Sequence, residues 1–283
     1  MTTSPAGLLA RALKSVLLTG ALVATVLAAA PATAAPAAPA INAVDFTGIV
    51  ALSNCSGSVV RTANSLPSDP VLVMSNGHCV KFFAPGEVIV NQRSTRTFNL
   101  LDSTGQRSLG TLRATALAYG TMTNTDVSFY RTSTTYAQLE QNFRSRALEL
   151  SSAHPTQGES IRVVSGFHRT IYSCNIDGFV FRLREDRWTW QDSIRYTSAC
   201  MTIPGTSGSP VEDTATGKIV GINNTGNEQG QRCTLDNPCE VDQNGTVTVR
   251  QGINYAQETW FISNCITTGS RFDLTRAGCG LPR

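Results

Sequence analysis

From Phe46 onward, the sequence is a series of short apolar or alternating segments separated by turn-forming residues. Alternating and apolar segments of this length are typical of β-strands, and Gly, Pro, Asn and Asp between them mark turns. Clear examples of such breakers are Pro85-Gly86, Asn76-Gly77 and Asn244-Gly245. The expected strands cover residues 57–60, 71–74, 87–91, 127–130, 161–165, 179–183, 218–222 and 246–253. Many short strands at this spacing predict an all-β protein built as an antiparallel sandwich or barrel.

Helix signals are few. Residues 136–148 place Tyr136, Leu139, Phe143 and Leu148 roughly on one face, and residues 133–135 offer N-cap side chains. Residues 257–266 favour a short C-terminal helix. The polar, irregular stretch 131–158 lies between the two β-rich halves and is the expected seam between them.

The first 35 residues have the features of a secretory signal peptide. Arg11 and Lys14 form a basic start, residues 16–30 are apolar, and residues 31–35 supply small residues for cleavage. A membrane anchor is the alternative, but the apolar run is short for a membrane span. We therefore expect a signal peptide over 1–35, a flexible Ala/Pro-rich lead-in over 36–45, an N-terminal β-barrel over 46–140, and a C-terminal β-barrel with a disulfide-bonded tail over 141–283.

Composition narrows the compartment and the partners. The hydrophobic content of 41% excludes disorder, and the charged content of 15% is below the roughly 25% of an average soluble domain. Without Arg11 and Lys14 the chain is nearly neutral, so its charge gives no case for nucleic acid binding. After residue 35, no segment is long and apolar enough to cross a membrane. We expect a secreted, extracellular protein that is a monomer.

The cysteines fit the expectation of a secreted protein. All eight follow residue 54, none forms a C-x-x-C pair, and only three histidines are present, which makes a zinc site the weaker interpretation. Spacing alone does not fix the pairing. Order along the chain suggests four neighbouring disulfides, Cys55 with Cys79, Cys174 with Cys200, Cys233 with Cys239, and Cys265 with Cys279.

Three local patterns carry possible chemistry, and they occur in the order His, Asp, Ser. An apolar strand ends in a turn that presents His78 beside a cysteine. Asp126 leads directly into an alternating strand, and Ser207 lies in a tight Gly-rich turn over residues 204–210. A serine hydroxyl becomes a good nucleophile when an imidazole takes its proton, and a buried carboxylate holds that imidazole in one tautomer. The backbone N–H groups of Gly205 and Ser207 could form an oxyanion hole.

Each pattern alone has an ordinary explanation, as a surface histidine, a turn-capping aspartate or a common Gly-rich turn. Together they resemble the trypsin-like (chymotrypsin-fold) serine proteases of the secreted bacterial type. Residues 75–79, S-N-G-H-C, are similar to the family's T-A-x-H-C box, and residues 126–129, D-V-S-F, to its D-[IV]-[AS]-[LF] box. Residues 205–210, G-T-S-G-S-P, are similar to its G-[DN]-S-G-[GS]-P box. The likeness spans about residues 46–266.

The resemblance implies two antiparallel six-stranded β-barrels with a catalytic triad of His78, Asp126 and Ser207 between them. It also implies a disulfide between Cys55 and Cys79, and no cofactor or metal. Residues 220–226 resemble the strand that pairs with substrate, which suggests Asn224 and Gly226 as substrate-binding residues. Met201 occupies the position at the base of the primary specificity pocket. Because Met201 is uncharged, we expect cleavage after apolar or small residues.

The resemblance also has departures. Thr206 replaces the family's Asp or Asn before the nucleophile, and residues 264–283 have no counterpart. In vertebrate relatives, a freed N-terminus pairs with that aspartate, so we expect Thr206 to hold its loop by hydrogen bonding and signal removal alone to yield active enzyme. The predicted function is a secreted serine endopeptidase acting on proteins or peptides. The alternatives are a catalytically silent binding protein with the same fold, or an esterase using the same three residues.

Overall fold

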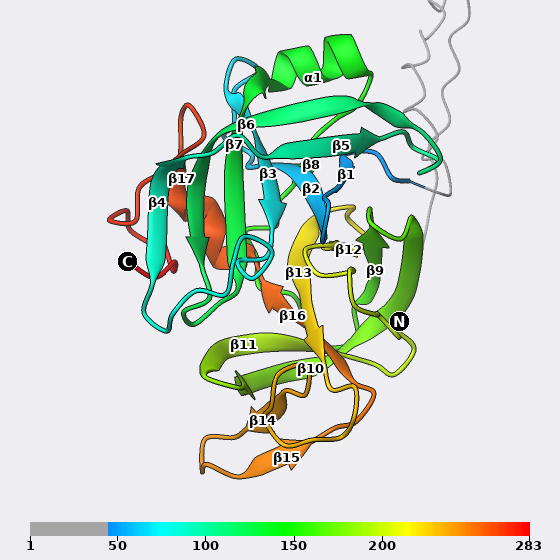
Figure 1. Cartoon of the computed structure of the whole chain (residues 1–283), viewed down its shortest axis with the longest axis vertical. Helices are drawn as coiled ribbons and strands as arrows, with labels where there is room; N and C mark the ends of the chain where they lie inside the picture. Colours follow the sequence, from blue (N-terminus) through cyan, green and yellow to red (C-terminus); the bar gives the residue numbers. More distant parts are fainter. Residues whose placement is uncertain (1–44) are drawn as a thin grey trace, which may run out of the picture. The chain divides into compact units, whose positions relative to one another are not determined.

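The computed structural model describes residues 45–283. The predicted signal peptide, and all but the last residue of the predicted lead-in, lie outside these residues. Regular structure in the described part is mostly β-strand, with one α-helix and one 3₁₀ helix (Figure 1).

The first sheet closes on itself as a six-stranded antiparallel barrel. Its strands pair around the ring in the order β1, β5, β6, β7, β3, β2 and back to β1. β4 adds to β6 outside the ring, and β8 pairs in parallel with β2. The elements are β1 (Ile49–Ala51), β2 (Ser56–Arg61), β3 (Pro70–Ser75), β4 (Val88–Arg93), β5 (Thr97–Leu101), β6 (Ser108–Thr121), β7 (Val127–Thr135), α1 (Tyr136–Phe143) and β8 (Leu148–Glu149).

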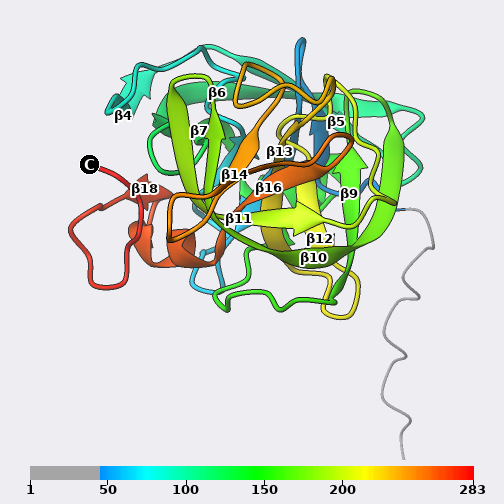
Figure 2. The ribbon, with the colours of Figure 1, turned by 90° about the horizontal axis from the view of Figure 1, so that it is seen from below.

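The second sheet forms another antiparallel ring of six strands, in the order β11, β16, β13, β12, β9, β10 and back to β11. A hairpin of β14 and β15 extends β10 (Figure 1), and Figure 2 shows the strands of the ring from below. The all-β prediction with two six-stranded barrels is therefore confirmed. The elements are β9 (Ser160–Ser165), β10 (Thr170–Glu185), β11 (Trp188–Tyr196), β12 (Pro210–Asp213), β13 (Ile219–Gly226), β14 (Cys239–Val241), β15 (Val247–Val249), β16 (Asn254–Glu258), η1 (Trp260–Cys265), β17 (Ile266–Thr267) and β18 (Arg271–Phe272).

Alternating burial fixes which face of each strand points inward. Along β5, Phe98 and Leu100 are buried while Thr97 and Asn99 are exposed. A one-residue register slip would reverse these faces, so the pattern specifies the pairing. One cluster of buried side chains draws on both barrels, with residues such as Met74 and Ile222. This shared core explains why the two barrels form one compact unit within the described residues.

The two predicted helices are present but shorter than expected. Thr135 caps α1, because its side chain accepts from the Gln138 N–H and the Gln138 side chain accepts from the Thr135 N–H. The helix ends at Phe143 rather than at 148, because Arg144 adopts a left-handed conformation with φ 53°. The C-terminal helix is a 3₁₀ helix that begins at Trp260 rather than at 257.

One strand pairing and one turn explain the corrections near the C-terminus. Gln257 and Glu258 belong to β16, where they pair with β13, so they are not available to the helix that follows. The strand expected over 246–253 is wrong in its second half. β15 ends at Val249, and a turn with Gly252 at φ 79° leads into β16.

The C-terminal tail returns to the first barrel, beside β4 and β7 in Figure 1. Phe272 stacks on Tyr119 of β6 with ring centroids 5.5 Å apart, and the Tyr119 hydroxyl donates to the Pro282 carbonyl over 2.9 Å. The Gly269 N–H donates to Asp69 over 2.9 Å. The tail thus covers one side of a barrel from which it is distant in sequence.

Four disulfides join the same cysteine pairs that chain order suggests. All eight cysteines of the described part are used. Such bonds persist in oxidising compartments, which indicates an extracellular or periplasmic protein. Within residues 45–283, no helix is long and apolar enough to cross a membrane.

Candidate active site

His78 and Asp126 meet because the strands that lead to them are neighbours. β3 ends at Ser75, β7 begins at Val127, and Ser75 lies opposite Ser128 in the antiparallel pair. The turn after β3 therefore lies beside the residue before β7. The Asn76 side chain donates to the Asp126 carbonyl over 2.8 Å and fastens the two segments together.

The Asp126 carboxylate holds both the ring and the backbone of His78. Its Oδ2 lies 2.6 Å from His78 Nδ1, and its Oδ1 accepts the His78 N–H over 3.0 Å. Asp126 is completely buried. A glycine is needed at position 77, since a Cβ there would collide with the Thr121 carbonyl and the Asp126 carboxylate. Because Oδ2 can only accept, Nδ1 carries a hydrogen and the lone pair of the neutral ring lies on Nε2.

Two opposing effects set the pKa of His78. Burial favours the neutral ring and lowers the pKa, whereas the charge of Asp126 and its hydrogen bond favour the protonated ring. Glu185 and Asp236 add smaller contributions in the same upward direction. The net result is a pKa above the ordinary value of 6.5.

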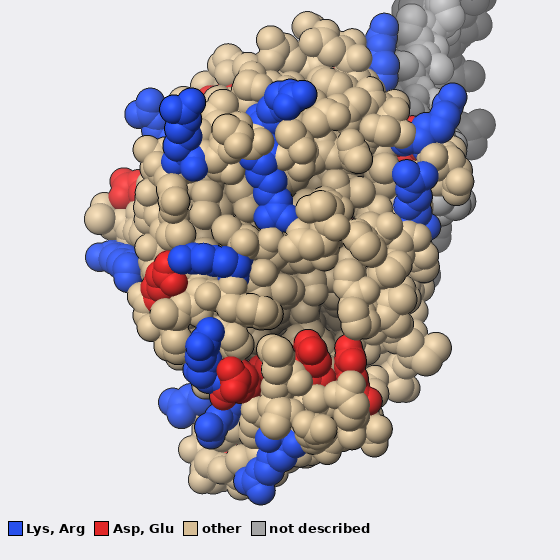
Figure 3. Space-filling view, viewed as in Figure 1, with Lys and Arg blue, Asp and Glu red and all other residues tan. Residues whose placement is uncertain are grey.

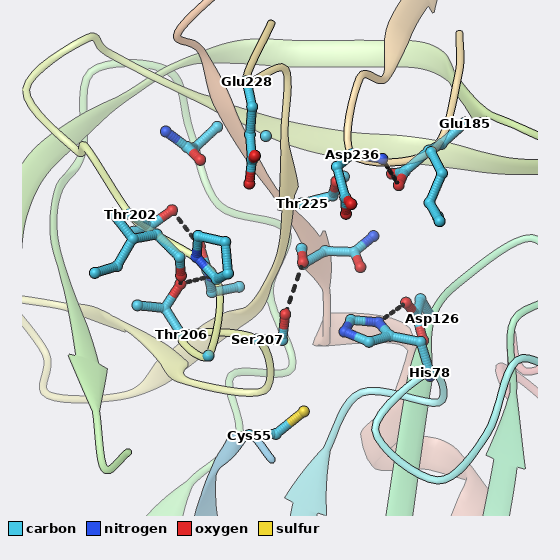
Figure 4. Close-up of a pocket in the computed structure, with 18 of the residues that line it drawn as sticks. Cys55, His78, Asp126, Glu185, Thr202, Thr206, Ser207, Thr225, Glu228 and Asp236 are labelled. Atoms are coloured by element: carbon cyan, nitrogen blue, oxygen red, sulfur yellow. Dashed lines mark hydrogen bonds and ion pairs between the residues drawn. The ribbon is translucent and has the colours of Figure 1, made fainter. Parts of the chain in front are cut away.

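Ser207 lies in a turn that only glycines allow. Gly205 and Gly208 have φ of 93° and 82°, and a Cβ at Gly208 would collide with the Ser56 carbonyl. The Ser207 hydroxyl donates to the Asn224 carbonyl over 3.3 Å (Figure 4). Among the hydrogen bonds of residues 45–283, none uses the N–H of Gly205 or of Ser207. Both amides are therefore free to bind an oxygen.

Thr206 stabilises this turn through its hydroxyl. Its Oγ1 donates to the Ile203 carbonyl over 2.6 Å and accepts from the Asn223 side chain over 3.0 Å. The side chain is only 2% exposed. The expectation that Thr206 holds its loop by hydrogen bonding is confirmed.

His78, Asp126 and Ser207 line one cleft of about 340 Å³, a volume within the usual range of ligand sites. Figure 4 shows His78 and Ser207 on the same side of this cleft, with the imidazole beside the hydroxyl. The Cys55–Cys79 disulfide lies next to this site, because Cys79 follows His78 and Cys55 lines the cleft.

The family model of the trypsin-like peptidase domain matches residues 55–222, more than half of the chain. The chain belongs to this family. Its two barrels and the cleft accordingly have the chymotrypsin-like arrangement.

Solved structures similar to this peptidase are distant in sequence. An inactive mutant form of Rv3671c from M. tuberculosis has 14% identity and a TM-score of 0.46, covering 76% of this chain and 82% of that one. The MamO protease domain from Magnetospirillum magneticum has 12% identity and a TM-score of 0.49, covering 80% and 100%. No curated protein sequence matches the chain.

The three residues expected to bind substrate do not all lie in the cleft of this peptidase. Asn224 and Gly226 line it. Met201 does not, and its side chain is 71% exposed. The preceding Cys200 is buried and bonded to Cys174, and the chain turns at this point so that the next side chain faces solvent. Thr202 and Asn254 line the cleft near this position instead.

Sequence reasoning missed the acidic lining of the peptidase's cleft. Glu185, Glu228 and Asp236 all line it, and its lining residues within the described chain include no Lys or Arg. Acidic side chains accordingly lie along one edge of the hollow in Figure 3. Glu185 Oε1 accepts the Asp236 N–H over 2.8 Å, and burial raises the pKa of Glu185 to about 7. No sequence signal placed these residues near His78, since they are more than 100 positions away.

An apolar wall beside His78 was also missed. Trp188 and Trp190 of β11 line the cleft with Phe82 and Met122 from the first barrel. The Trp188 indole donates to the Phe83 carbonyl over 2.9 Å, and the Trp190 indole donates to the Met122 carbonyl over 3.1 Å. The W-T-W alternation could have indicated a buried face, but not that this face meets the other barrel.

Proposed function

We propose that the chain is an exported serine endopeptidase, with Ser207 as nucleophile, His78 as general base and Asp126 as the residue that orients the base. The observation that carries the proposal is the 2.6 Å contact between the buried Asp126 carboxylate and His78 Nδ1, in the cleft that Ser207 lines. This contact leaves Nε2 as the proton acceptor and stabilises the imidazolium that forms on proton transfer.

In the proposed reaction, rotation of the Ser207 side chain takes Oγ from the Asn224 carbonyl to His78 Nε2. Oγ then attacks the scissile carbonyl carbon as its proton moves to Nε2. The imidazolium returns that proton to the leaving nitrogen as the C–N bond breaks, which leaves an acyl-enzyme. A water molecule, deprotonated by His78, hydrolyses the ester and restores Ser207.

The free N–H groups of Gly205 and Ser207 would bind the oxygen that becomes negative in the tetrahedral intermediate. Each such donor is worth about 10²–10³ in turnover. The two N–H groups need no rearrangement of the loop, because Thr206 already holds it by two hydrogen bonds.

Replacing Ser207 tests the proposal. Ser207→Ala should lower kcat by about 10⁶ on a protein substrate and abolish labelling by a fluorophosphonate probe. Ser173→Ala is the matched control, because Ser173 is an exposed serine of β10 outside the cleft. If the wild-type protein neither labels nor cleaves, the chain is a binding protein with a protease fold. If it labels and hydrolyses only small esters, the esterase alternative holds.

A further inference from the structure

A second cluster of polar side chains lies outside the cleft. It brings together His154 from the segment between β8 and β9, Asp192 of β11 and Glu258 at the end of β16. His154 Nε2 lies 3.2 Å from Asp192 Oδ2 and 3.0 Å from Glu258 Oε1. The three atoms lie within 4.8 Å of one another, and none of these residues lines the cleft.

The hydrogen bonds of His154 leave the two carboxylates of this cluster without a positive charge beside them. Nδ1 bonds to the Pro155 carbonyl, which only accepts, so Nδ1 carries a hydrogen. The neutral ring then turns the lone pair of Nε2 toward the two carboxylates. A protonated ring could donate to Asp192, but Glu258 Oε1 would still lack a donor.

The missing donor is energetically costly because the Glu258 carboxylate is buried. The residue is 2% exposed, and Oε1 has no hydrogen bond within the described chain. The other oxygen, Oε2, accepts from the Trp260 indole over 2.7 Å. A buried carboxylate of this kind needs a proton or a cation beside it.

We propose that His154, Asp192 and Glu258 bind one Zn²⁺ through Nε2, Oδ2 and Oε1. Tetrahedral zinc with ligand bonds of about 2.0–2.1 Å separates neighbouring ligand atoms by about 3.3 Å, close to the two distances here. One imidazole and two carboxylates suit zinc, whereas calcium takes six to eight oxygens. Side chains of His154 and Asp192 are 39% and 50% exposed, so water can reach the fourth position.

The surroundings already orient the ligands as a metal site requires. The Nδ1 bond to the Pro155 carbonyl is the outer contact that fixes the tautomer of a metal-binding histidine. Phe179 and Trp260 pack on the His154 ring, with centroids 4.6 and 5.7 Å away. The ion would tie the segment after β8 to two strands of the second barrel. Its role would be structural, and the site does not depend on the function proposed for the cleft.

Zinc titration of the mature chain tests this site. The reference protein carries His78→Ala, because the imidazole of the cleft could bind zinc itself. After equilibration with ZnCl₂ and dialysis, we expect one zinc per chain by elemental analysis, micromolar or tighter affinity by calorimetry, and a raised Tm. His154→Gln should weaken zinc binding at least about 100-fold, since even outer contacts of metal ligands are worth 10–100-fold.

Two further variants decide between specific and adventitious binding. His168→Gln removes the remaining histidine, which is half-buried outside the cleft with its ring bonded to the Pro204 carbonyl, and should leave zinc affinity unchanged. Asp192→Asn changes an exposed carboxylate and should weaken binding without preventing folding. The proposal is overturned if the reference protein retains no zinc, if His154→Gln binds it equally well, or if His168→Gln is the variant that loses it. In the first case the cluster is an ion pair only.

Discussion

At the scale of single residues, Asp126 determines both where His78 points and when it is protonated. The carboxylate contacts the ring and the backbone N–H of the same residue, so the imidazole is fixed at two places. Its charge and hydrogen bond, together with smaller contributions from Glu185 and Asp236, outweigh the effect of burial on the His78 pKa. These two roles can be separated experimentally, because one acts on the rate and the other on its pH dependence.

Asp126→Asn should change both the rate and its pH dependence. The proposed base works only when His78 is neutral. Because the pKa of His78 is raised, wild-type kcat/KM should fall as the pH decreases, with its midpoint above pH 6.5. Without the carboxylate, burial lowers the pKa, and the midpoint should move to lower pH. Turnover should fall about 10⁴-fold, as when a triad aspartate is amidated. The measurement is kcat/KM from pH 5 to 9, with Asp177→Asn, outside the cleft, as control. An unmoved midpoint would contradict the assigned role.

At the scale of elements, the loop between β13 and β14 shapes the charge of the cleft. The Cys233–Cys239 disulfide closes it, and the buried Asn227 side chain donates to the Gln231 and Pro238 carbonyls over 2.9 Å each. The loop is thus fixed while it presents Glu228 and Asp236 to the cleft. A fixed acidic lining attracts cationic side chains of a substrate.

We therefore expect a preference for basic residues close to the scissile bond. In peptides with one constant apolar residue at P1, Lys at the neighbouring positions should give higher kcat/KM than Glu. The double variant Glu228→Gln, Asp236→Asn should reduce the ratio of kcat/KM for the Lys peptide to that for the Glu peptide about tenfold. In the wild type, 0.5 M salt should also reduce this ratio, because salt screens the charges. Glu140→Gln, which changes an exposed carboxyl of α1 outside the cleft, is the control. An equal ratio in the double variant and the wild type would exclude this role for the loop.

At the scale of the whole molecule, the sequence predicts what is local and misses what depends on folding. His78, Asp126 and Ser207 each lie at a strand end or in a tight turn, so short patterns found them. Glu185 reaches the cleft only because β10 is long and the disulfide loop folds against its end, which no short pattern contains. Met201 was misplaced for the same reason, since its orientation depends on the buried cysteine before it. The position of the C-terminal tail was not predicted, because the residue that it packs against, Tyr119, is far away in sequence.

The last prediction concerns how the active conformation is reached. In vertebrate relatives the loop before the nucleophile depends on a freed N-terminus, but Thr206 is uncharged and already has two hydrogen bonds within the described chain. Residues 36–283 expressed under disulfide-forming conditions should therefore label at Ser207 to the same extent with or without an N-terminal tag. Thr206→Val keeps the shape and removes both bonds, so it should lower kcat/KM at least about tenfold in either form. If a folded, tagged protein labels only after the tag is removed, the free terminus completes the site and Thr206 does not suffice.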